Sequence, residues 1–167
     1  MKLNIMDIVP GTSVDGPGLR TAIYMAGCGH ACAGCHNRDS WDQHAGRLMS
    51  LREIMEIVGE NGFPVTLTGG DPLYNPENAI ALIRAIRTLD LGPIWLYTGY
   101  TWEEIISTPA LLKAVRETDV VVDGPFMESL RDLSLNFCGS SNQRIILVKP
   151  SLDQASPVEW SAPVYDF

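Results

Sequence analysis

The feature that most constrains this chain is a short cluster of cysteines in residues 27–37, which read GCGHACAGCHN. Cys28, Cys32 and Cys35 are spaced C-x3-C-x2-C. Several of the residues between them are small, which suits a loop whose backbone approaches a ligand closely. Three thiols packed into eight residues are poorly spaced for disulfides, because a disulfide needs paired Cβ vectors and would leave one thiol over. The cluster therefore predicts metal ligation.

The length and composition indicate one globular domain. The chain has 167 residues, of which 46% are hydrophobic and 19% are charged. This is enough apolar material to bury a core without disulfides. We expect a single domain over residues 1–167, with its core in residues 4–149 and an extended or partly ordered C-terminal arm in residues 150–167.

The charge and the hydropathy pattern argue against two classes of partner. The net charge of −8 argues against nucleic-acid binding, which needs a basic surface to neutralise phosphates. No run of 18 apolar residues is present, so we expect no membrane span. The N-terminal segment lacks the long apolar stretch of a signal peptide. These observations predict a cytoplasmic protein, in which disulfides are rare.

Short apolar runs alternate with amphipathic stretches along most of the chain. Strands that alternate with helices form parallel sheets with right-handed crossovers, so the expected fold class is α/β. A complete eight-unit barrel needs about 250 residues, so we expect a partial, open parallel β/α barrel. Strands are predicted at residues 3–9 (a short edge strand), 21–26, 64–68, 93–97, 119–122 and 143–148, whereas residues 38–49 are expected to be irregular or weakly helical.

Three predicted helices have recognisable N-terminal signals. Ser50 with Glu53, and Thr101 with Glu104, fit the capping-box pattern. Asn75 precedes a proline and is a good N-cap for the next helix. These signals place helices between the predicted strands, as a parallel sheet requires.

Polar or glycine-rich loops follow four of the predicted strands directly. In a parallel sheet the C-terminal ends of the strands lie along one edge, and that edge carries the ligand site. One glycine turn would do no more than end a strand, whereas four at the same pole predict a shared site. The loops are the cysteine cluster, Gly69-Gly70-Asp71-Pro72, Thr98-Gly99-Tyr100 and Asp123-Gly124-Pro125.

The spacing of the thiols leaves two metal chemistries open. A structural zinc site needs four protein ligands, and His30, His36 or Cys138 could supply the fourth. An iron–sulfur cubane normally takes four thiolates, so three would leave one iron open for a substrate or cofactor. C-x3-C-x2-C is not a usual zinc-ribbon spacing. The spacing therefore favours iron–sulfur without excluding zinc.

Motifs beyond the cysteines resemble those of a known family. C-x3-C-x2-C after a first barrel strand is similar to the signature of the radical S-adenosylmethionine (radical SAM) superfamily. SVDGPGLR at residues 13–20, followed by the cysteine cluster, resembles the glycyl-radical-enzyme activases. Within them, TLTGGDPLYNPEN, WLYTGYTWEE, VVVDGPF, RDLSL and GSSNQRII look like the activases of anaerobic ribonucleoside-triphosphate reductase. The resemblance covers residues 4–148.

This resemblance implies an oxidoreductase whose chemistry is carried by its cofactors rather than by a catalytic side chain. Cys28, Cys32 and Cys35 would be the metal ligands of a 4Fe-4S cluster, and the open iron would bind SAM. A one-electron donor such as a flavodoxin would reduce the cluster, and SAM would be cleaved to methionine and a 5′-deoxyadenosyl radical. That radical would take a hydrogen atom from a glycine of the partner, the large subunit of the reductase.

The same resemblance implies which residues surround SAM. Asp71 would receive its amino group, although a turn before a helix explains an aspartate there as well. For His36, a polar residue that orients the site is the competing explanation. Asn142 and Gln143 would border the adenine. The expected cofactor-binding residues are Gly34, Cys35, His36, Gly69, Gly70, Asp71, Tyr97, Thr98 and Gly99.

Two features depart from common patterns in these families. Gly34 stands where many superfamily members have an aromatic residue, and reductase activases often lack that aromatic too. Cys138 stands where the family more often has a basic residue, and a fourth thiolate would contradict an open iron. We interpret Cys138 as an ordinary buried thiol. For Arg20, before the first core strand, a salt bridge in a tight turn is as good an explanation as a direct role.

Overall fold

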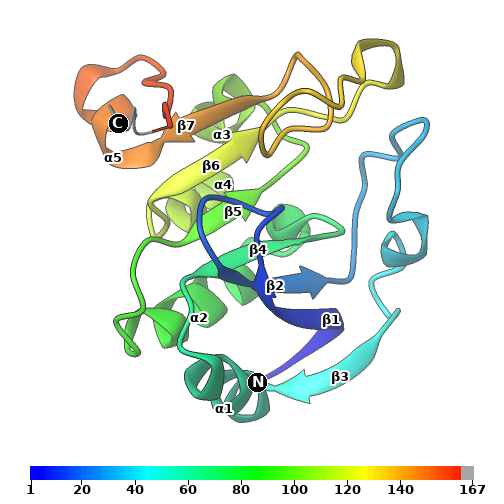
Figure 1. Ribbon diagram of the computed structural model, residues 1–167, viewed down its shortest axis with the longest axis vertical. Coiled ribbons are helices and arrows are strands. Elements are labelled where there is room, and N and C mark those ends of the chain that lie inside the picture. The colour runs from blue at the N-terminus through cyan, green and yellow to red at the C-terminus, as the bar shows by residue number, and fades with distance from the viewer. Residues whose placement is uncertain (163–167) are drawn as a thin grey trace.

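The computed structural model describes residues 1–162. This part of the chain contains a mixed α/β fold with a seven-stranded sheet of order β3-β1-β2-β4-β5-β6-β7. The sheet is open, with β3 and β7 as its edges (Figure 1). The strands are β1 Lys2–Thr12, β2 Arg20–Met25, β3 Arg47–Ser50, β4 Val65–Gly69, β5 Trp95–Tyr97, β6 Val120–Asp123 and β7 Arg144–Leu147.

Only the middle of the sheet is parallel. The pairs β2–β4, β4–β5 and β5–β6 are parallel, whereas β1–β2, β1–β3 and β6–β7 are antiparallel. The prediction of a sheet that does not close is confirmed, but the prediction that it is parallel throughout is wrong at both sides. The cause at one side is connection length. Parallel neighbours need a crossover of a dozen or more residues, and residues 13–19 between β1 and β2 are too few.

Two local predictions are also wrong. Residues 3–9, predicted as an edge strand, belong to β1, which lies between β3 and β2. Residues 38–49 include a 3-10 turn, η1 Arg38–Ser40, but they also contribute most of β3. This strand has four residues, with Met49 buried and Leu48 exposed. Such a short run is too brief for alternation to be recognised in the sequence.

The helices begin where the capping signals predict. Ser50 and Glu53 form both hydrogen bonds of a capping box, as do Thr101 and Glu104. The side chain of Asn75 caps the next helix. No helix within residues 1–162 combines the length and apolar character needed to cross a bilayer. The helices are α1 Leu51–Asn61, α2 Pro76–Arg87, α3 Trp102–Ser107, α4 Pro109–Val115 and α5 Val148–Gln154.

The segment after β7 is more ordered than an extended arm. It begins as α5, which follows β7 directly. The chain then returns to the sheet, where Glu159 forms a bridge with Ile146 and the N–H of Trp160 donates to the carbonyl of Ile145 over 2.7 Å. Residues 163–167, the end of the expected arm, lie outside the described residues.

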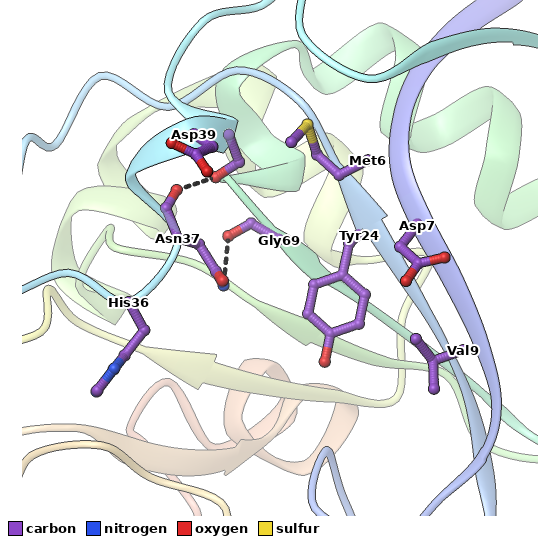
Figure 2. Close-up of a pocket in the computed structure, with 9 residues that line it drawn as sticks. Met6, Asp7, Val9, Tyr24, His36, Asn37, Asp39 and Gly69 are labelled. Carbon is purple, nitrogen blue, oxygen red and sulfur yellow. Dashed lines mark hydrogen bonds between the residues drawn. The ribbon is translucent and has the colours of Figure 1, made fainter.

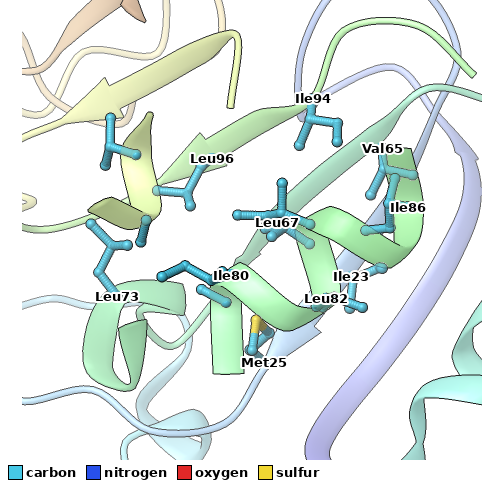
Figure 3. Close-up of a cluster of buried hydrophobic side chains, with 14 of the residues drawn as sticks. Ile23, Met25, Val65, Leu67, Leu73, Ile80, Leu82, Ile86, Ile94 and Leu96 are labelled. Carbon is cyan, nitrogen blue, oxygen red and sulfur yellow. The ribbon is translucent and has the colours of Figure 1, made fainter. Parts of the chain in front are cut away.

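The main hydrophobic core covers one face of the sheet. Leu67 and Leu96 on the strands belong to the same buried cluster as Ile80, Leu82 and Ile86 of α2 (Figure 3). All five side chains are at most 4% exposed. Each such burial stabilises the fold by about 1.5–3 kcal/mol. This face is therefore closed to ligands.

The opposite face carries a smaller aromatic cluster. Trp95 packs edge-on against Phe137 and Trp160, with ring centroids 5.7 and 5.4 Å apart. Such edge-to-face contacts add to the stabilisation from burial. Because Trp95 begins β5, the cluster covers this face near the N-terminal ends of the parallel strands. The C-terminal ends remain open for a site.

Candidate functional site

A cavity of about 240 Å³ lies at the C-terminal ends of the parallel strands. All four loops predicted to meet at this edge contribute to its lining, so the prediction that they share one place is confirmed. We call this cavity the mouth. Of the residues expected around the cofactors, Gly34, Asp71 and Asn142 lie outside the lining. The others line the cavity and are Cys28, Cys32, Cys35, His36, Gly69, Gly70, Tyr97, Thr98, Gly99 and Gln143.

The cysteine loop is closed at its base by backbone hydrogen bonds. The N–H of Gly27 donates to the carbonyl of Ser40 over 2.7 Å, and the N–H of Cys28 donates to the carbonyl of Trp41 over 3.2 Å. Ser40 is buried, so the base of the loop is anchored in the protein. The three thiols are free of disulfides and half-buried. The loop thus presents them to the cavity from a fixed base.

The thiols form an electron-rich group. Burial raises the pKa of the Cys28 thiol, and the proximity of Asp71 and of the other two thiols raises it further. The backbone N–H of Asn37 donates to Sγ of Cys35 over 3.4 Å. Like charges in close proximity disfavour one another, and a bound cation removes that penalty. The thiol set is therefore suited to hold a positively charged metal centre.

Asp71 is the polar hub behind the cavity, and its carboxylate is 2% exposed. Oδ2 accepts hydrogen bonds from Oγ1 of Thr98 at 2.9 Å and from the N–H of Gly99 at 3.0 Å. The same oxygen lies 2.6 Å from Nε2 of His30. Oδ1 accepts from the N–H of Leu73 at 2.8 Å and caps the 3-10 turn that follows. Asp71 therefore ties three loops together, and direct contact with a cofactor would have to replace one of these partners.

His30, which the sequence suggested only as a zinc ligand, instead pairs with Asp71. The hydrogen bond to Asp71 raises the pKa of the imidazole, although burial opposes this rise. The ring lies edge-on to Tyr100, with centroids 4.6 Å apart. A Cβ atom at Gly99 would lie 2.5 Å from this ring. The glycine is therefore required where the cysteine loop and the loop after β5 meet.

Gly70 lies where the loops after β2 and β4 meet. Its N–H donates to the carbonyl of Met25 over 2.8 Å. A Cβ atom at position 70 would lie 2.4 Å from the carbonyl oxygen of Gly27. Close packing of the two backbones thus requires glycine here. The carbonyl of the neighbouring Gly69 accepts from the side chain of Asn37 over 3.4 Å (Figure 2).

A second cavity of about 440 Å³ adjoins the first above β1 and β2 (Figure 2). The two cavities share His36, Asn37 and Gly69 in their linings. The hydroxyl of Tyr24 in the second cavity donates to Asp15 over 3.2 Å. Burial raises the pKa of Tyr24 to about 12. The phenol therefore stays protonated at neutral pH and acts as a hydrogen-bond donor.

Tyr97 and Gly34 connect the mouth with the segment after β6. The hydroxyl of Tyr97 donates to the carbonyl of Phe137 over 2.8 Å, and burial raises its pKa. A Cβ atom at Gly34 would lie 2.8 Å from the side chain of Glu128. The exposed Glu128 side chain can move aside, but Gly34 has a φ of +72°, a conformation that a larger residue such as an aromatic adopts only with strain.

Comparisons with known proteins agree with a cluster at this mouth. Residues 14–146 match the family model described as a 4Fe-4S single cluster domain. The anaerobic ribonucleoside-triphosphate reductase-activating protein of Enterobacteria phage T4 is 35% identical over 150 residues, which cover 86% of this chain and 93% of the relative. The protein of that name from Escherichia coli K12 is 33% identical over 150 residues, with 84% and 96% covered. The one from Haemophilus influenzae is 34% identical over 153 residues, with 86% and 97% covered.

The chain belongs to the family of anaerobic ribonucleoside-triphosphate reductase-activating proteins. Its matched 4Fe-4S domain contains the three clustered cysteines and all four loops of the mouth. Within residues 1–162, no group of three or more His, Cys, Asp or Glu side chains is arranged to hold a single metal ion. The irons of a cubane stand at separate corners, so its thiolates need not converge on one point. The description of the matched family model is what favours an iron–sulfur cluster over zinc in this chain.

The fourth cysteine of this family member lies apart from the other three. Cys138 packs against the aromatic cluster formed by Trp95, Phe137 and Trp160. Burial raises the pKa of its thiol to about 11. The thiol is half-buried, like the other three, so it is less buried than expected, and what distinguishes it is its place in the aromatic cluster.

Some residues of the site were missed because their partners are distant in sequence. His30 and Asp71 are separated by 41 positions, and no local pattern indicates that they pair. Phe126 lines the cavity and lies 5.9 Å from the ring of His36, centroid to centroid. It directly follows the Asp123-Gly124-Pro125 loop, which was the one available signal.

Proposed function

We propose that this chain is a radical SAM enzyme that activates anaerobic ribonucleoside-triphosphate reductase. It would cleave SAM reductively at a 4Fe-4S cluster and leave a glycyl radical on the large subunit of the reductase. One observation carries the proposal: three disulfide-free thiols share a cavity with the loops after β4 and β5. The names of relatives that match most of this chain supply the partner.

Cys28, Cys32 and Cys35 are the proposed metal ligands. When bound, a 4Fe-4S cluster with one iron free of protein ligands supplies the electron that cleaves SAM to methionine and a 5′-deoxyadenosyl radical, which takes a hydrogen atom from the partner's glycine. The cysteine loop contributes a fixed base, a half-buried position and a backbone N–H directed at one sulfur. Hydrogen bonds to the sulfurs and limited solvent access both tune the reduction potential of such clusters.

We propose that SAM binds between the cysteine loop and the loops after β4 and β5. Gly69 and Gly70 line the cavity, and a backbone carbonyl is an acceptor that suits an ammonium group. Asp71 contributes by holding Thr98, Gly99 and the cysteine loop in fixed positions relative to one another. The full proposed set is Gly34, Cys35, His36, Gly69, Gly70, Asp71, Tyr97, Thr98 and Gly99.

The proposal also includes an electron donor and a compartment. The chemistry consumes one electron for each SAM cleaved, so a one-electron protein donor such as a flavodoxin is required. A cytoplasmic location agrees with four cysteines that form no disulfide.

Anaerobic reconstitution with iron and sulfide tests the cofactors. We expect about four irons per chain and, after reduction with dithionite, formation of 5′-deoxyadenosine from SAM. Cys32→Ala should lose the cluster, whereas the matched Cys138→Ser variant should keep it because Cys138 lies in the aromatic cluster. Zinc in place of iron, or a reduced cluster that leaves SAM intact, would exclude a radical SAM enzyme.

Electron paramagnetic resonance then tests the partner. Reduced protein, SAM and the anaerobic reductase from the same organism should yield a glycyl radical signal. SAM cleavage without that signal would show that the partner is wrong. A signal obtained only with a different glycyl radical enzyme would identify the chain as the activase of that enzyme.

A further inference from the structure

The segment between β6 and β7 exposes several large apolar side chains beside the mouth. It carries Met127, Leu130 and Leu133, whose side chains are 42%, 39% and 86% exposed. Val14, 72% exposed, lines the same cleft as Leu133. We call Val14, Met127, Leu130 and Leu133 the apolar rim. Burying such side chains is favourable, so an ordered segment that leaves them in water points to a partner.

Side-chain hydrogen bonds hold the two ends of this segment together, next to β6 and β7. The side chain of Gln143 accepts from the N–H groups of Gly139 and Ser140 and donates to the carbonyl of Gly124. The side chain of Asn142 donates to the carbonyl of Pro125 over 2.8 Å. These side chains, which the resemblance placed near adenine, therefore fix the segment by hydrogen bonds with its own backbone.

Hydrogen bonds also cross the segment nearer its tip. The N–H of Ser141 donates to the carbonyl of Leu130 over 2.9 Å, and Arg131 forms a bridge with Ser140. Figure 1 shows this segment, in yellow, projecting beyond the end of β6. The exposed leucines are thus presented by a fixed backbone, which reduces the ordering cost of binding.

The apolar rim is connected to the cysteine mouth. A cleft of about 450 Å³ is lined by Leu133, Val14 and Phe137, among others. It shares His36 and Tyr97 with the cavity that the three cysteines line. A protein bound at the rim would therefore have a chain segment within reach of the mouth.

The charges beside the apolar rim indicate what kind of partner surface would be complementary to it. Among residues 124–143 and the cleft lining, Glu128, Asp132 and Asp15 are acidic, and Arg131 is the lysine or arginine present. The whole chain carries a net charge of −8. Complementary potentials favour a partner whose apolar patch is bordered by lysine or arginine.

We propose that the apolar rim is the docking surface for the folded protein substrate, which binds it through an apolar patch bordered by basic residues. The inference rests on the proposed function, because it takes the occupant to be the anaerobic reductase. It adds where the reductase docks: on the segment between β6 and β7 and on Val14, beside the mouth rather than within it. Interfaces of this kind concentrate their affinity in a few apolar anchors, and Leu133 is the most exposed candidate.

The test compares Leu133→Ser with Leu48→Ser in the cluster-loaded protein. Leu48 is 54% exposed on the edge strand β3 and serves as the matched control away from the rim. We expect Leu133→Ser to weaken binding to the reductase at least tenfold and to lower the glycyl radical yield at subsaturating reductase. SAM cleavage with dithionite in the absence of reductase should be unchanged in both variants.

Four other outcomes would overturn the docking surface. Leu133→Ser could bind within twofold of wild type, or Leu48→Ser could lose as much affinity as Leu133→Ser. Sedimentation could show that wild type is a dimer and Leu133→Ser a monomer with unchanged reductase affinity, which would assign the rim to a second copy of this chain. If wild type cleaves SAM but does not bind the reductase, the reductase is neither the partner nor the protein that occupies the rim. Met127→Ser and Leu130→Ser repeat the test should Leu133→Ser fold poorly.

Discussion

Two buried charges occupy opposite ends of the parallel strands. Asp71 lies behind the mouth, at the C-terminal ends, and Arg20 lies at the N-terminal end of β2. They are 2% and 1% exposed. Neither charge is free, but their partners differ in kind. Asp71 is held by groups from three loops, and one of its partners is an imidazole.

Arg20 is held by the scaffold instead. Its guanidinium donates to Oγ1 of Thr66 at 2.7 Å, to the carbonyl of Val65 at 2.8 Å and to the carbonyl of Pro93 at 2.5 Å. It lies over the ring of Trp95, 5.6 Å from the centroid. No carboxylate within residues 1–162 forms a salt bridge with it, so the suggestion of a salt-bridging arginine is wrong. Burial lowers its pKa to about 10, which leaves it charged at neutral pH.

The difference separates stability from function. A charge whose partners are strand residues and carbonyls maintains the sheet, whereas a charge whose partners are site loops maintains the geometry of the mouth. Disrupting Arg20 should therefore unfold the protein more readily than it alters the site. Disrupting Asp71 should alter the site at a smaller cost in stability.

The largest effect on stability is expected for Arg20→Met. The substitution keeps most of the side-chain volume but leaves Thr66 and two carbonyls without their donor. We expect a loss of about 3 kcal/mol in the free energy of unfolding, because each buried group left unpaired costs roughly 1–3 kcal/mol. For a chain of this size that corresponds to a fall in Tm of roughly 6–12 °C. Thermal unfolding of the apo-protein measures it. Arg131→Met, at an exposed arginine, is the control and should change Tm by little.

Asp71→Ala should have a smaller effect on stability and a larger one on the site. It removes the acceptor for His30, Thr98, Gly99 and Leu73. The cost should be about 2 kcal/mol, less than for Arg20, because the donors that line the cavity can bond to water instead. SAM affinity should fall at least tenfold, because the loops that Asp71 holds line the proposed SAM site. Equilibrium binding of SAM to the cluster-loaded variant measures this. Asp71→Asn keeps one acceptor oxygen and should be intermediate. A variant that unfolds as readily as Arg20→Met but binds SAM normally would contradict the separation of roles.

The parts of the fold that were predictable from sequence are those that depend on residues close together in the chain. Capping residues such as Ser50 and Asn75 act within a few residues, so the helix starts were readable from sequence. The order of loops around the mouth followed from the topology of parallel strands. The antiparallel edges were not readable, because β3 has only four residues and pairs with β1, more than 40 positions away. Long-range pairing leaves no local pattern.

The sequence predicted where the site lies but not the hydrogen bonds that hold its side chains together. The thiols and the glycine loops were identified because each has its own short motif. The contact of His30 with Asp71 was not, since it depends on how two loops pack. Arg20 was misjudged for the same reason: its partners Thr66 and Pro93 belong to other strands and connections. Buried charges satisfied by distant neutral groups give no sequence signal.

A milder effect is expected for His30→Phe. Phenylalanine keeps a ring against Tyr100 but removes the contact with Asp71, which retains its three other partners. We expect a loss of about 1 kcal/mol and a fall in Tm of roughly 2–4 °C. Iron content after reconstitution should match wild type, because His30 is not a proposed ligand, while SAM affinity should fall by less than in Asp71→Ala. A fall in Tm as large as that of Asp71→Ala would make His30, rather than Asp71, the hub.

The smallest effect concerns Cys138, the thiol outside the mouth, and it is one of reactivity rather than stability. Burial raises its pKa to about 11, so at pH 8 only about one thiol in a thousand is ionised, against roughly a quarter for an ordinary thiol. In apo-protein with serine at positions 28, 32 and 35, alkylation of native Cys138 by iodoacetamide should be roughly two hundredfold slower than in urea, because the thiolate is the nucleophile. The rate should rise about tenfold per pH unit until the pH approaches 11. Equal rates in native and unfolded protein at pH 8 would show that the aromatic cluster does not shield this cysteine.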